Sequence, residues 1–204
     1  MHSEYLGKED ILPKEIGLLA VDKDSLLAGR DLMRELTRYN SGRFPEIVTK
    51  DCAEAIFAFL DDLPGVLEAM EKSPRTLTHN DFNTRNIALR SSGEHPRLVV
   101  YDWELPSVQN PQRDLIEFLV YALPENVPVR LIDEYAEYYR KKLEEKSRIV
   151  MNKDEFDRLL IYHSLVLASR RFNLYLLAHN VMQFSFMNRV YANLSRFILD
   201  TYRR

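Results

Sequence analysis

Residues 77–90 read LTHNDFNTRNIALR, and this stretch decides how the chain is interpreted. A histidine, an aspartate and three asparagines stand together between two short apolar segments. The turn-rich SSGEHP follows, and then RLVVYDWE over residues 97–104. Two short apolar runs separated by turn residues predict a β-hairpin. The polar run is therefore predicted to form a loop that leads into the first strand of this hairpin.

The predicted hairpin brings three oxygen-bearing side chains towards one cleft. Asp81 and Asn86 are five residues apart on the loop, and Asp102 stands at the end of the second strand. A tight hairpin returns the chain close to its start, so Asp102 is expected near Asn86. Carboxylate and amide oxygens suit Mg²⁺, with waters and substrate phosphates completing its shell. Phosphoryl transfer requires this combination of alignment, metal-neutralised charge and a carboxylate that accepts a hydroxyl proton.

The same spacing occurs in protein kinases, where an Asp, an Asn five residues on and a later metal-binding Asp form the site. HNDFNTRN and YDWE resemble the aminoglycoside phosphotransferase and choline kinase-like family of small-molecule kinases. Downstream, NPQRDLIEFL resembles the segment of that family in which an Asp opens the next helix. Upstream, HSEYLGKED resembles the hinge between the two lobes, whose backbone meets adenine.

The resemblance implies a role for each matching residue. Asp81 would be catalytic, and Asn86 and Asp102 would hold Mg²⁺. Three residues would orient the loop, namely His79, Asn80 and Asp114. Three others would form a nucleotide hinge, namely Glu4, Tyr5 and Leu6. Glu104 would reach a second metal or face solvent, and Arg85 would approach phosphate or be an ordinary exposed arginine. The simpler alternatives are a turn aspartate at 81, capping groups around the hairpin, and a helix N-cap at Asp114.

The periodicity of the remaining sequence predicts a mainly α fold with a small β-hairpin. Extended segments are expected at 3–6 and 76–78, and hairpin strands at 87–90 and 97–101. Helices are expected at about 25–39, 50–60, from Pro64, 112–122, 129–146, 153–179 and 184–202. By resemblance, residues 1–204 form one domain, the C-terminal lobe of a protein-kinase-like phosphotransferase. It would consist of a hinge-like segment at 1–20, the catalytic loop and metal-binding hairpin at 77–104, and a helical subdomain at 112–204.

Composition excludes several classes of protein. A net charge of −3 argues against a nucleic-acid binder. Cys52 is the only cysteine, which favours a reducing compartment, and the first fifteen residues lack the apolar core of a signal peptide. The longest stretch without Asp, Glu, Lys or Arg, 172–188, is too polar for a membrane span and predicts a buried helix pair. The expected location is cytoplasmic.

No two of the six glycines are closer than ten positions, so the chain has no glycine-rich phosphate loop. The N-terminal lobe of such kinases, which supplies that loop and a phosphate-binding lysine, is therefore expected to be absent. The predicted function is transfer of the γ-phosphoryl group of ATP, with Mg²⁺, to a hydroxyl of a small molecule. The isolated chain is expected to turn over weakly. The alternative is a non-catalytic binding or regulatory module, and an exposed lobe-facing surface would favour an N-lobe partner or a homo-oligomer.

The acceptor is left open between an amino alcohol, an aminoglycoside-like sugar and another metabolite. Asn83 and Thr84 replace the His-Pro of the phosphotransferase branch, which keeps the substrate class undecided. Aromatic residues of the last two predicted helices would either pack the core or form a cage for a quaternary ammonium group. This aromatic set comprises Tyr162, Phe172, Tyr175, Phe184, Phe186, Tyr191 and Phe197.

Overall fold

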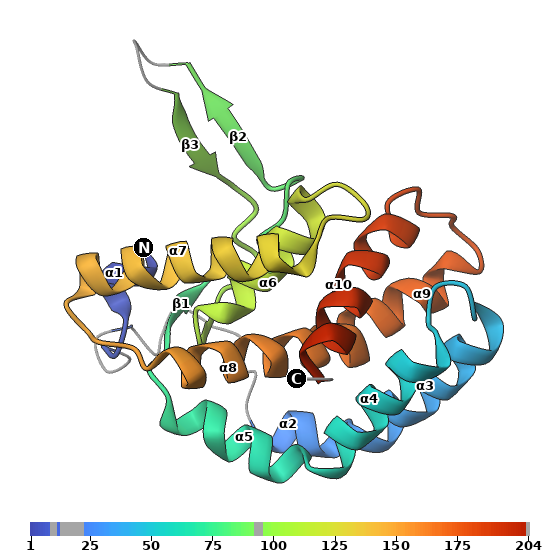
Figure 1. The fold of residues 1–204 in the computed structure, drawn as a ribbon. Helices are drawn as coiled ribbons and strands as arrows, with labels where there is room; N and C mark the ends of the chain where they lie inside the picture. Colours follow the sequence, from blue (N-terminus) through green and yellow to red (C-terminus); the bar gives the residue numbers. More distant parts are fainter. Residues whose placement is uncertain (9–11, 13–22, 92–95, 203–204) are drawn as a thin grey trace.

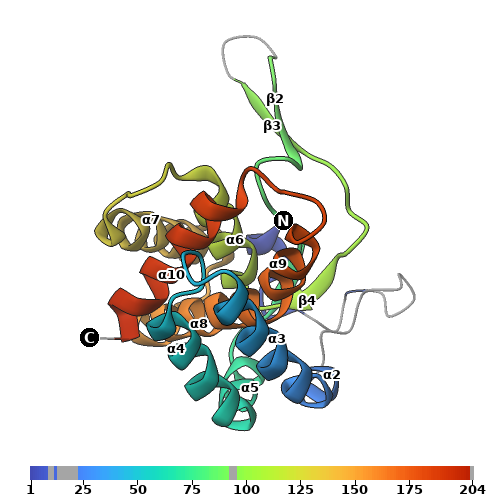
Figure 2. The same cartoon turned by 90° about the vertical axis from the view of Figure 1, so that its right-hand side faces the viewer.

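The computed structural model describes residues 1–8, 12, 23–91 and 96–202. Helices make up most of it, and a narrow hairpin projects from the helical body (Figures 1 and 2). The helices are α1 (His2–Tyr5), α2 (Lys23–Ala28), α3 (Arg30–Arg43), α4 (Lys50–Asp61), α5 (Leu63–Lys72), α6 (Gln112–Ala122), α7 (Val129–Ser147), α8 (Lys153–Val166), the π-helix η3 (Leu167–Phe172), α9 (Asn173–His179) and α10 (Met187–Tyr202). The strands are β1 (Thr76–Thr78), β2 (Ile87–Arg90), β3 (Arg97–Val100) and β4 (Ser107–Gln109).

The strands form two separate antiparallel pairs. In the hairpin, β2 pairs with β3 so that Ile87 lies opposite Val100. The second pair joins β1 to β4, with Thr78 opposite Ser107. The chain thus leaves β1, forms the polar loop, runs out and back along the hairpin, and returns to β4 beside its starting point. Both ends of the loop-and-hairpin segment are therefore fixed to the helical body by one short sheet.

The core lies between α6, α8 and α10, which contact one another, and α4 packs on α10. Helix α10 contributes Val190, Tyr191 and Leu194, whose side chains are fully buried. Helix α6 is buried along nearly its whole length, including its charged residues. Because buried charges are tolerated only with partners, the charged groups of α6 must be paired inside the molecule.

Local signals explain where several helices begin and end. The Thr49 side chain accepts a hydrogen bond from the N–H of Cys52 and so caps α4. The Asn152 side chain accepts one from the N–H of Glu155 and caps α8, as the sequence predicts. Pro64 lies in the first turn of α5, where its missing N–H costs nothing. These contacts fix helix ends that periodicity alone locates only approximately.

Three expectations about local structure are wrong. The segment expected to be extended at 3–6 is helical up to Tyr5, and the rest of the expected irregular stretch lies largely outside the described residues. The expected helix at 25–39 is two helices that meet at Gly29. The expected helix at 153–179 is interrupted by the π-helix η3. The mainly helical fold with its hairpin is confirmed, and among the described residues no helix has both the length and the apolar character needed to cross a membrane.

Candidate active site

The polar loop, residues 79–86, is held at its start by a carboxylate from α6. Asp114 Oδ2 accepts the backbone N–H of His79 at 2.7 Å, and Oδ1 accepts that of Asn80 at 2.9 Å. Asn80 has a left-handed backbone with φ 60°, a conformation that costs a non-glycine residue energy and needs such support. Asp114 lies within the first turn of α6, and Pro111 occupies the N-cap position. Asp114 therefore supports the loop and does not cap the helix.

Asp114 also binds the first helix of the chain. His2 Nε2 lies 3.1 Å from Asp114 Oδ2, and His2 Nδ1 contacts the hydroxyl of Tyr139. Burial by itself raises the pKa of the Asp114 carboxyl. The hydrogen bond and charge of His2, the N–H of His79 and the charge of Arg113 act in the opposite direction and leave this pKa below its usual value. The loop is thus supported by an ionised carboxylate.

Asp81 lies inside a set of donors. Its Oδ2 accepts the amide N–H of Asn86 at 2.7 Å. Its Oδ1 accepts the amide N–H of Asn83 at 3.1 Å and Nη1–H of Arg171 at 2.8 Å. The side chain keeps 19% of its surface exposed, so it can still be reached from the cleft. The structure therefore brings Asp81 and Asn86 into direct contact.

Asp102 follows the hairpin strand that ends beside Asn86. The N–H of Tyr101 donates to the backbone oxygen of Asn86 at 3.1 Å, which places Asp102 one residue beyond that bond. Asp102 has a left-handed backbone with φ 65°, and its side chain is exposed. Within the described part of the chain, its carboxylate makes no hydrogen bond or ion pair. The carboxylate of Asp102 thus has no partner among the described residues, whereas that of Asp81 accepts three hydrogen bonds.

Two side-chain oxygens near the loop are of the type that hard divalent cations bind. The amide nitrogen of Asn86 is used by Asp81, which leaves its amide oxygen for another partner. That oxygen and the Asp102 carboxylate belong to adjacent backbone segments and are the ligand type that Mg²⁺ prefers. The described residues contain no group of three His, Cys, Asp or Glu side chains that could hold a metal. A cation here would therefore need waters or phosphate oxygens in addition to the protein ligands.

His79 and Asn80 connect the parts of the site. His79 Nε2–H donates to the backbone oxygen of Tyr101 at 2.9 Å, and the ring lies 4.5 Å from that of Trp103. His79 thus contacts both neighbours of Asp102. The backbone oxygen of Asn80 accepts hydrogen bonds from Arg171 at 2.5 Å and Arg113 at 3.3 Å. These contacts hold the loop in shape and leave both residues buried.

Arg85 folds back onto aromatic rings. Its N–H and Nε–H donate to Asn83 Oδ1, and its guanidinium carbon lies 5.4 Å from the ring centre of Tyr121 and 5.0 Å from that of Phe186. In the aromatic set defined above, Phe172, Tyr191 and Phe197 belong to the buried core. The cation-binding ring faces near the loop are thus occupied by the chain's own arginine.

A cleft of about 470 Å³ opens beside the loop and falls within the usual size of ligand sites. Asp81, Glu104 and Arg171 contribute its polar lining, and Leu105, Leu167 and Leu174 part of its apolar lining. Glu104 is exposed within this lining. The proposed hinge residues lie elsewhere: Glu4 and Tyr5 belong to α1, which packs on α7 and β1, and Leu6 is fully buried. Their role at a nucleotide stays a prediction.

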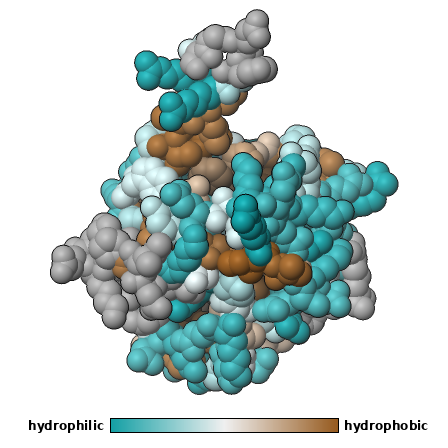
Figure 3. All heavy atoms as spheres, turned by 90° about the vertical axis from the view of Figure 1, so that its left-hand side faces the viewer, coloured by the Kyte–Doolittle hydropathy of each residue, from teal (hydrophilic) through white to brown (hydrophobic). Residues whose placement is uncertain are grey.

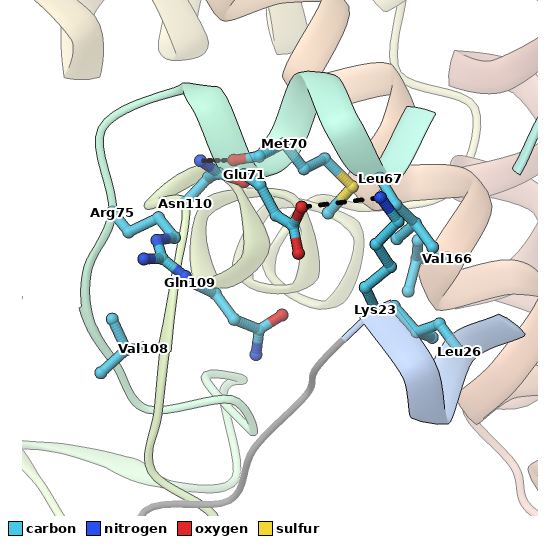
Figure 4. Close-up of a pocket in the computed structure, with 10 residues that line it drawn as sticks. All are labelled: Lys23, Leu26, Leu67, Met70, Glu71, Arg75, Val108, Gln109, Asn110 and Val166. Atoms are coloured by element: carbon cyan, nitrogen blue, oxygen red, sulfur yellow. Dashed lines mark hydrogen bonds and ion pairs between the residues drawn. The ribbon is translucent and has the colours of Figure 1, made fainter. Parts of the chain in front are cut away.

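A second, smaller hollow lies between α5, the start of α2 and β4 (Figure 4). Its volume is about 110 Å³, well below the usual size of ligand sites. Lys23 and Glu71 point towards each other across it at 3.9 Å, and Asn110 donates to the backbone oxygen of Met70 at 3.1 Å. The larger cleft, which Asp81 and Glu104 line, is therefore the better candidate for a ligand site.

Sequence reasoning missed the buried charges behind the loop. Arg171 contacts Asp81 and Glu117, and Glu117 also pairs with Arg113 at 2.7 Å. One signal was present in the sequence: the pair Arg170–Arg171 interrupts an otherwise apolar helical run. Charges at such positions need buried partners, and π-helices often mark functional sites.

Comparisons with known proteins point to one family. Residues 24–151, well over half of the chain, match the ecdysteroid kinase-like family. The matched range includes the polar loop, the hairpin and Asp114. No curated protein and no solved structure matches the chain. The chain belongs to the ecdysteroid kinase-like family, within the aminoglycoside phosphotransferase and choline kinase-like superfamily that its catalytic-loop motif resembles.

Proposed function

We propose that the chain is the C-terminal lobe of a small-molecule kinase that transfers the γ-phosphoryl group of ATP to a hydroxyl group. This proposal rests on the contact between Asp81 and Asn86. It also rests on the carboxylate of Asp102, which is unpaired in the described part of the chain and follows the Asn86–Tyr101 hydrogen bond by one residue. Family membership supports the use of ATP. The left-handed backbone of Asn80 in the loop, and of Asp102 after the hairpin, is also typical of a functional site.

Each residue has a distinct part in the proposed reaction. Asp81 orients the acceptor hydroxyl and receives its proton, because its carboxylate borders the cleft. Asn86 and Asp102 would hold Mg²⁺, which neutralises the charge of the nucleotide phosphates when bound. His79 fixes the strand end that presents Asp102, and Asp114 fixes the backbone of the loop.

For the acceptor, we propose an uncharged, hydroxyl-bearing molecule with an apolar body, such as a steroid. The family description names ecdysteroids, and the cleft has an apolar wall that includes Leu105, Leu167 and Leu174. A cationic amino alcohol is a poorer fit, since Arg85 already covers the nearby rings of Tyr121 and Phe186. A positively charged acceptor would also approach Arg171.

The test has two stages. In the first, calorimetry measures Mg²⁺–ATP binding to the full chain, to Asp102→Ala and to the exposed control Asp31→Ala. We expect binding by wild type and the control and at least a tenfold loss for Asp102→Ala. In the second, an ecdysteroid, an amino alcohol and an aminoglycoside are compared as acceptors of labelled phosphate. Equal binding by wild type and Asp102→Ala would contradict the metal assignment, and preference for the amino alcohol would contradict the acceptor class.

The competing proposal is a non-catalytic binding module that keeps the fold of such a kinase. Its support is the hairpin, where Leu89 is 71% exposed and Leu98 and Val99 are also exposed. Figure 3 shows apolar atoms gathered along the hairpin, below the hydrophilic atoms of its outer part. A module of this kind would show no dependence of nucleotide binding on Asp102, so the first stage of the test separates the two proposals.

A further inference from the structure

Arg171 links the polar loop to helix α6 through a single guanidinium group. Its Nη1–H groups reach Asp81 Oδ1 at 2.8 Å and Glu117 Oε1 at 2.6 Å, and its Nη2–H donates to the backbone oxygen of Asn80. The side chain is 17% exposed and Glu117 is fully buried. Arg171 thus contacts the catalytic loop and α6 from the π-helix η3, which interrupts the α-helical run between α8 and α9.

Two arginines and two carboxylates share this region. Glu117 Oε2 is paired with Arg113 at 2.7 Å, so Glu117 remains paired even without Arg171. Asp81 has no second cation among the ion pairs of the described residues, and its other donors are the neutral amides of Asn83 and Asn86. Loss of Arg171 would therefore leave Asp81 as the one uncompensated charge of the set.

The two acidic residues of the site consequently differ in charge balance. Asp81 is neutralised by Arg171, whereas the exposed carboxylate of Asp102 makes no ion pair in the described part of the chain. We infer that Arg171 is a positioning residue that neutralises and orients the Asp81 carboxylate. Asp81 then binds the acceptor hydroxyl, and the divalent cation is bound by Asn86 and Asp102. This inference rests on the proposed function for its chemistry, but the pairing itself can be tested without any activity.

The first experiment measures urea midpoints of the full chain in a double-mutant cycle. Asp81→Asn should lower the midpoint of wild type, because it leaves Arg171 with one partner fewer. In the Arg171→Gln background, Asp81→Asn should not lower the midpoint, because the Asp81 carboxylate that it removes is no longer balanced by a cation. The matched control is Arg140→Gln, which removes an arginine that also bridges two carboxylates, Glu137 and Glu144, away from the cleft.

In the Arg140→Gln background, Asp81→Asn should behave as in wild type. An equal lowering by Asp81→Asn in all three backgrounds would show that Arg171 does not balance the charge of Asp81 and would overturn the inference. This outcome would leave the metal-binding stage of the proposed function untouched, because that stage depends on Asp102.

The second experiment titrates Mn²⁺ alone. A guanidinium beside the site repels a divalent cation, so Arg171→Gln should bind Mn²⁺ roughly threefold to tenfold more tightly than wild type. Adding Asp81→Asn to Arg171→Gln should reverse this gain in Mn²⁺ affinity. The Asp81 carboxylate, which becomes available to the cation when Arg171 is replaced, is then absent. A merely structural arginine would leave Mn²⁺ affinity unchanged or weaken it, and either result would overturn the inference. Absence of Mn²⁺ binding in both proteins would contradict the inference and the proposed function together.

Discussion

The polar loop and the hairpin are consecutive in sequence but are held in opposite ways. The loop is supported from distant parts of the chain, by His2 through Asp114 and by Arg171. The hairpin is supported mainly by its own strand pairing, and most of its side chains are exposed on both faces. Asp81 belongs to the supported region, whereas Asp102 stands at the base of the exposed one.

This difference has a consequence for ligand binding. A carboxylate with three donors in place, such as Asp81, needs no reorganisation before an acceptor arrives. The carboxylate of Asp102 has no protein partner in the described chain, so its position depends on the hairpin and on the contact of His79 with Tyr101. Half of the candidate site is therefore pre-organised by the fold, and under the proposed function the other half would adapt to nucleotide and metal.

The largest effect is expected where the supported region depends on one side chain. Asp114→Ala removes the acceptor of two buried backbone N–H groups and the partner of His2. We expect a loss of about 3–5 kcal/mol in the free energy of unfolding, the usual cost of breaking a buried charged network. Urea denaturation measures it, and hydrogen exchange should accelerate at the amides of His79 and Asn80.

The matched control is Asp114→Asn, which keeps one acceptor oxygen and should cost less. Similar small losses for both variants, below about 1 kcal/mol, would show that the loop does not depend on this carboxylate. The loop and the hairpin would then not differ in how they are supported.

A second, smaller effect should appear when the pH is lowered. His163 on α8 lies behind the site and is bonded to Asn110 Oδ1 at 3.1 Å. Burial, aided by the charge of Arg113, lowers the pKa of His163 to about 3. The unfolded chain binds this proton below about pH 6.5, whereas the native state does so only near pH 3. The stabilisation is thus complete above pH 6.5 and declines by about 1.4 kcal/mol per pH unit below it.

Urea denaturation of wild type and His163→Gln at several pH values between 6.5 and 4.5 isolates this contribution. The variant should lack it, so the difference between the two proteins should change by about 2–3 kcal/mol over that range. Parallel pH curves would show that His163 titrates normally and that the interior behind the loop is open to water.

The sequence predicted the elements whose signals are local. The bounds of α6 agree with the predicted helix at 112–122, and the hairpin strands agree to within one residue, since apolar periodicity and turn residues define both. The sequence placed Asp81 and Asn86 on one loop that leads into the hairpin, and the structure shows them hydrogen-bonded. The roles assigned to them remain predictions.

Features that depend on distant partners were not predicted. Strand β4 has only three residues, and it exists because β1 lies beside it. Helix α1 is short and is stabilised by contacts with α7 and β1. The pairing of Arg171 with Asp81 joins residues ninety positions apart, and no local pattern specifies which carboxylate a buried arginine will reach.

The smallest effect is expected on the hairpin, where Leu89→Ser replaces a side chain that is 71% exposed. Because folding buries little of the apolar surface of Leu89, the free energy of unfolding should change by less than about 0.5 kcal/mol. The same change at the fully buried Leu176 of α9 should cost roughly 3 kcal/mol or more. Both are measured by urea denaturation at two protein concentrations.

A large, concentration-dependent loss for Leu89→Ser would mean that the hairpin is covered by a second copy of the chain. In that case the exposed half of the site would be organised by association, and its contrast with the loop would hold only for the isolated chain.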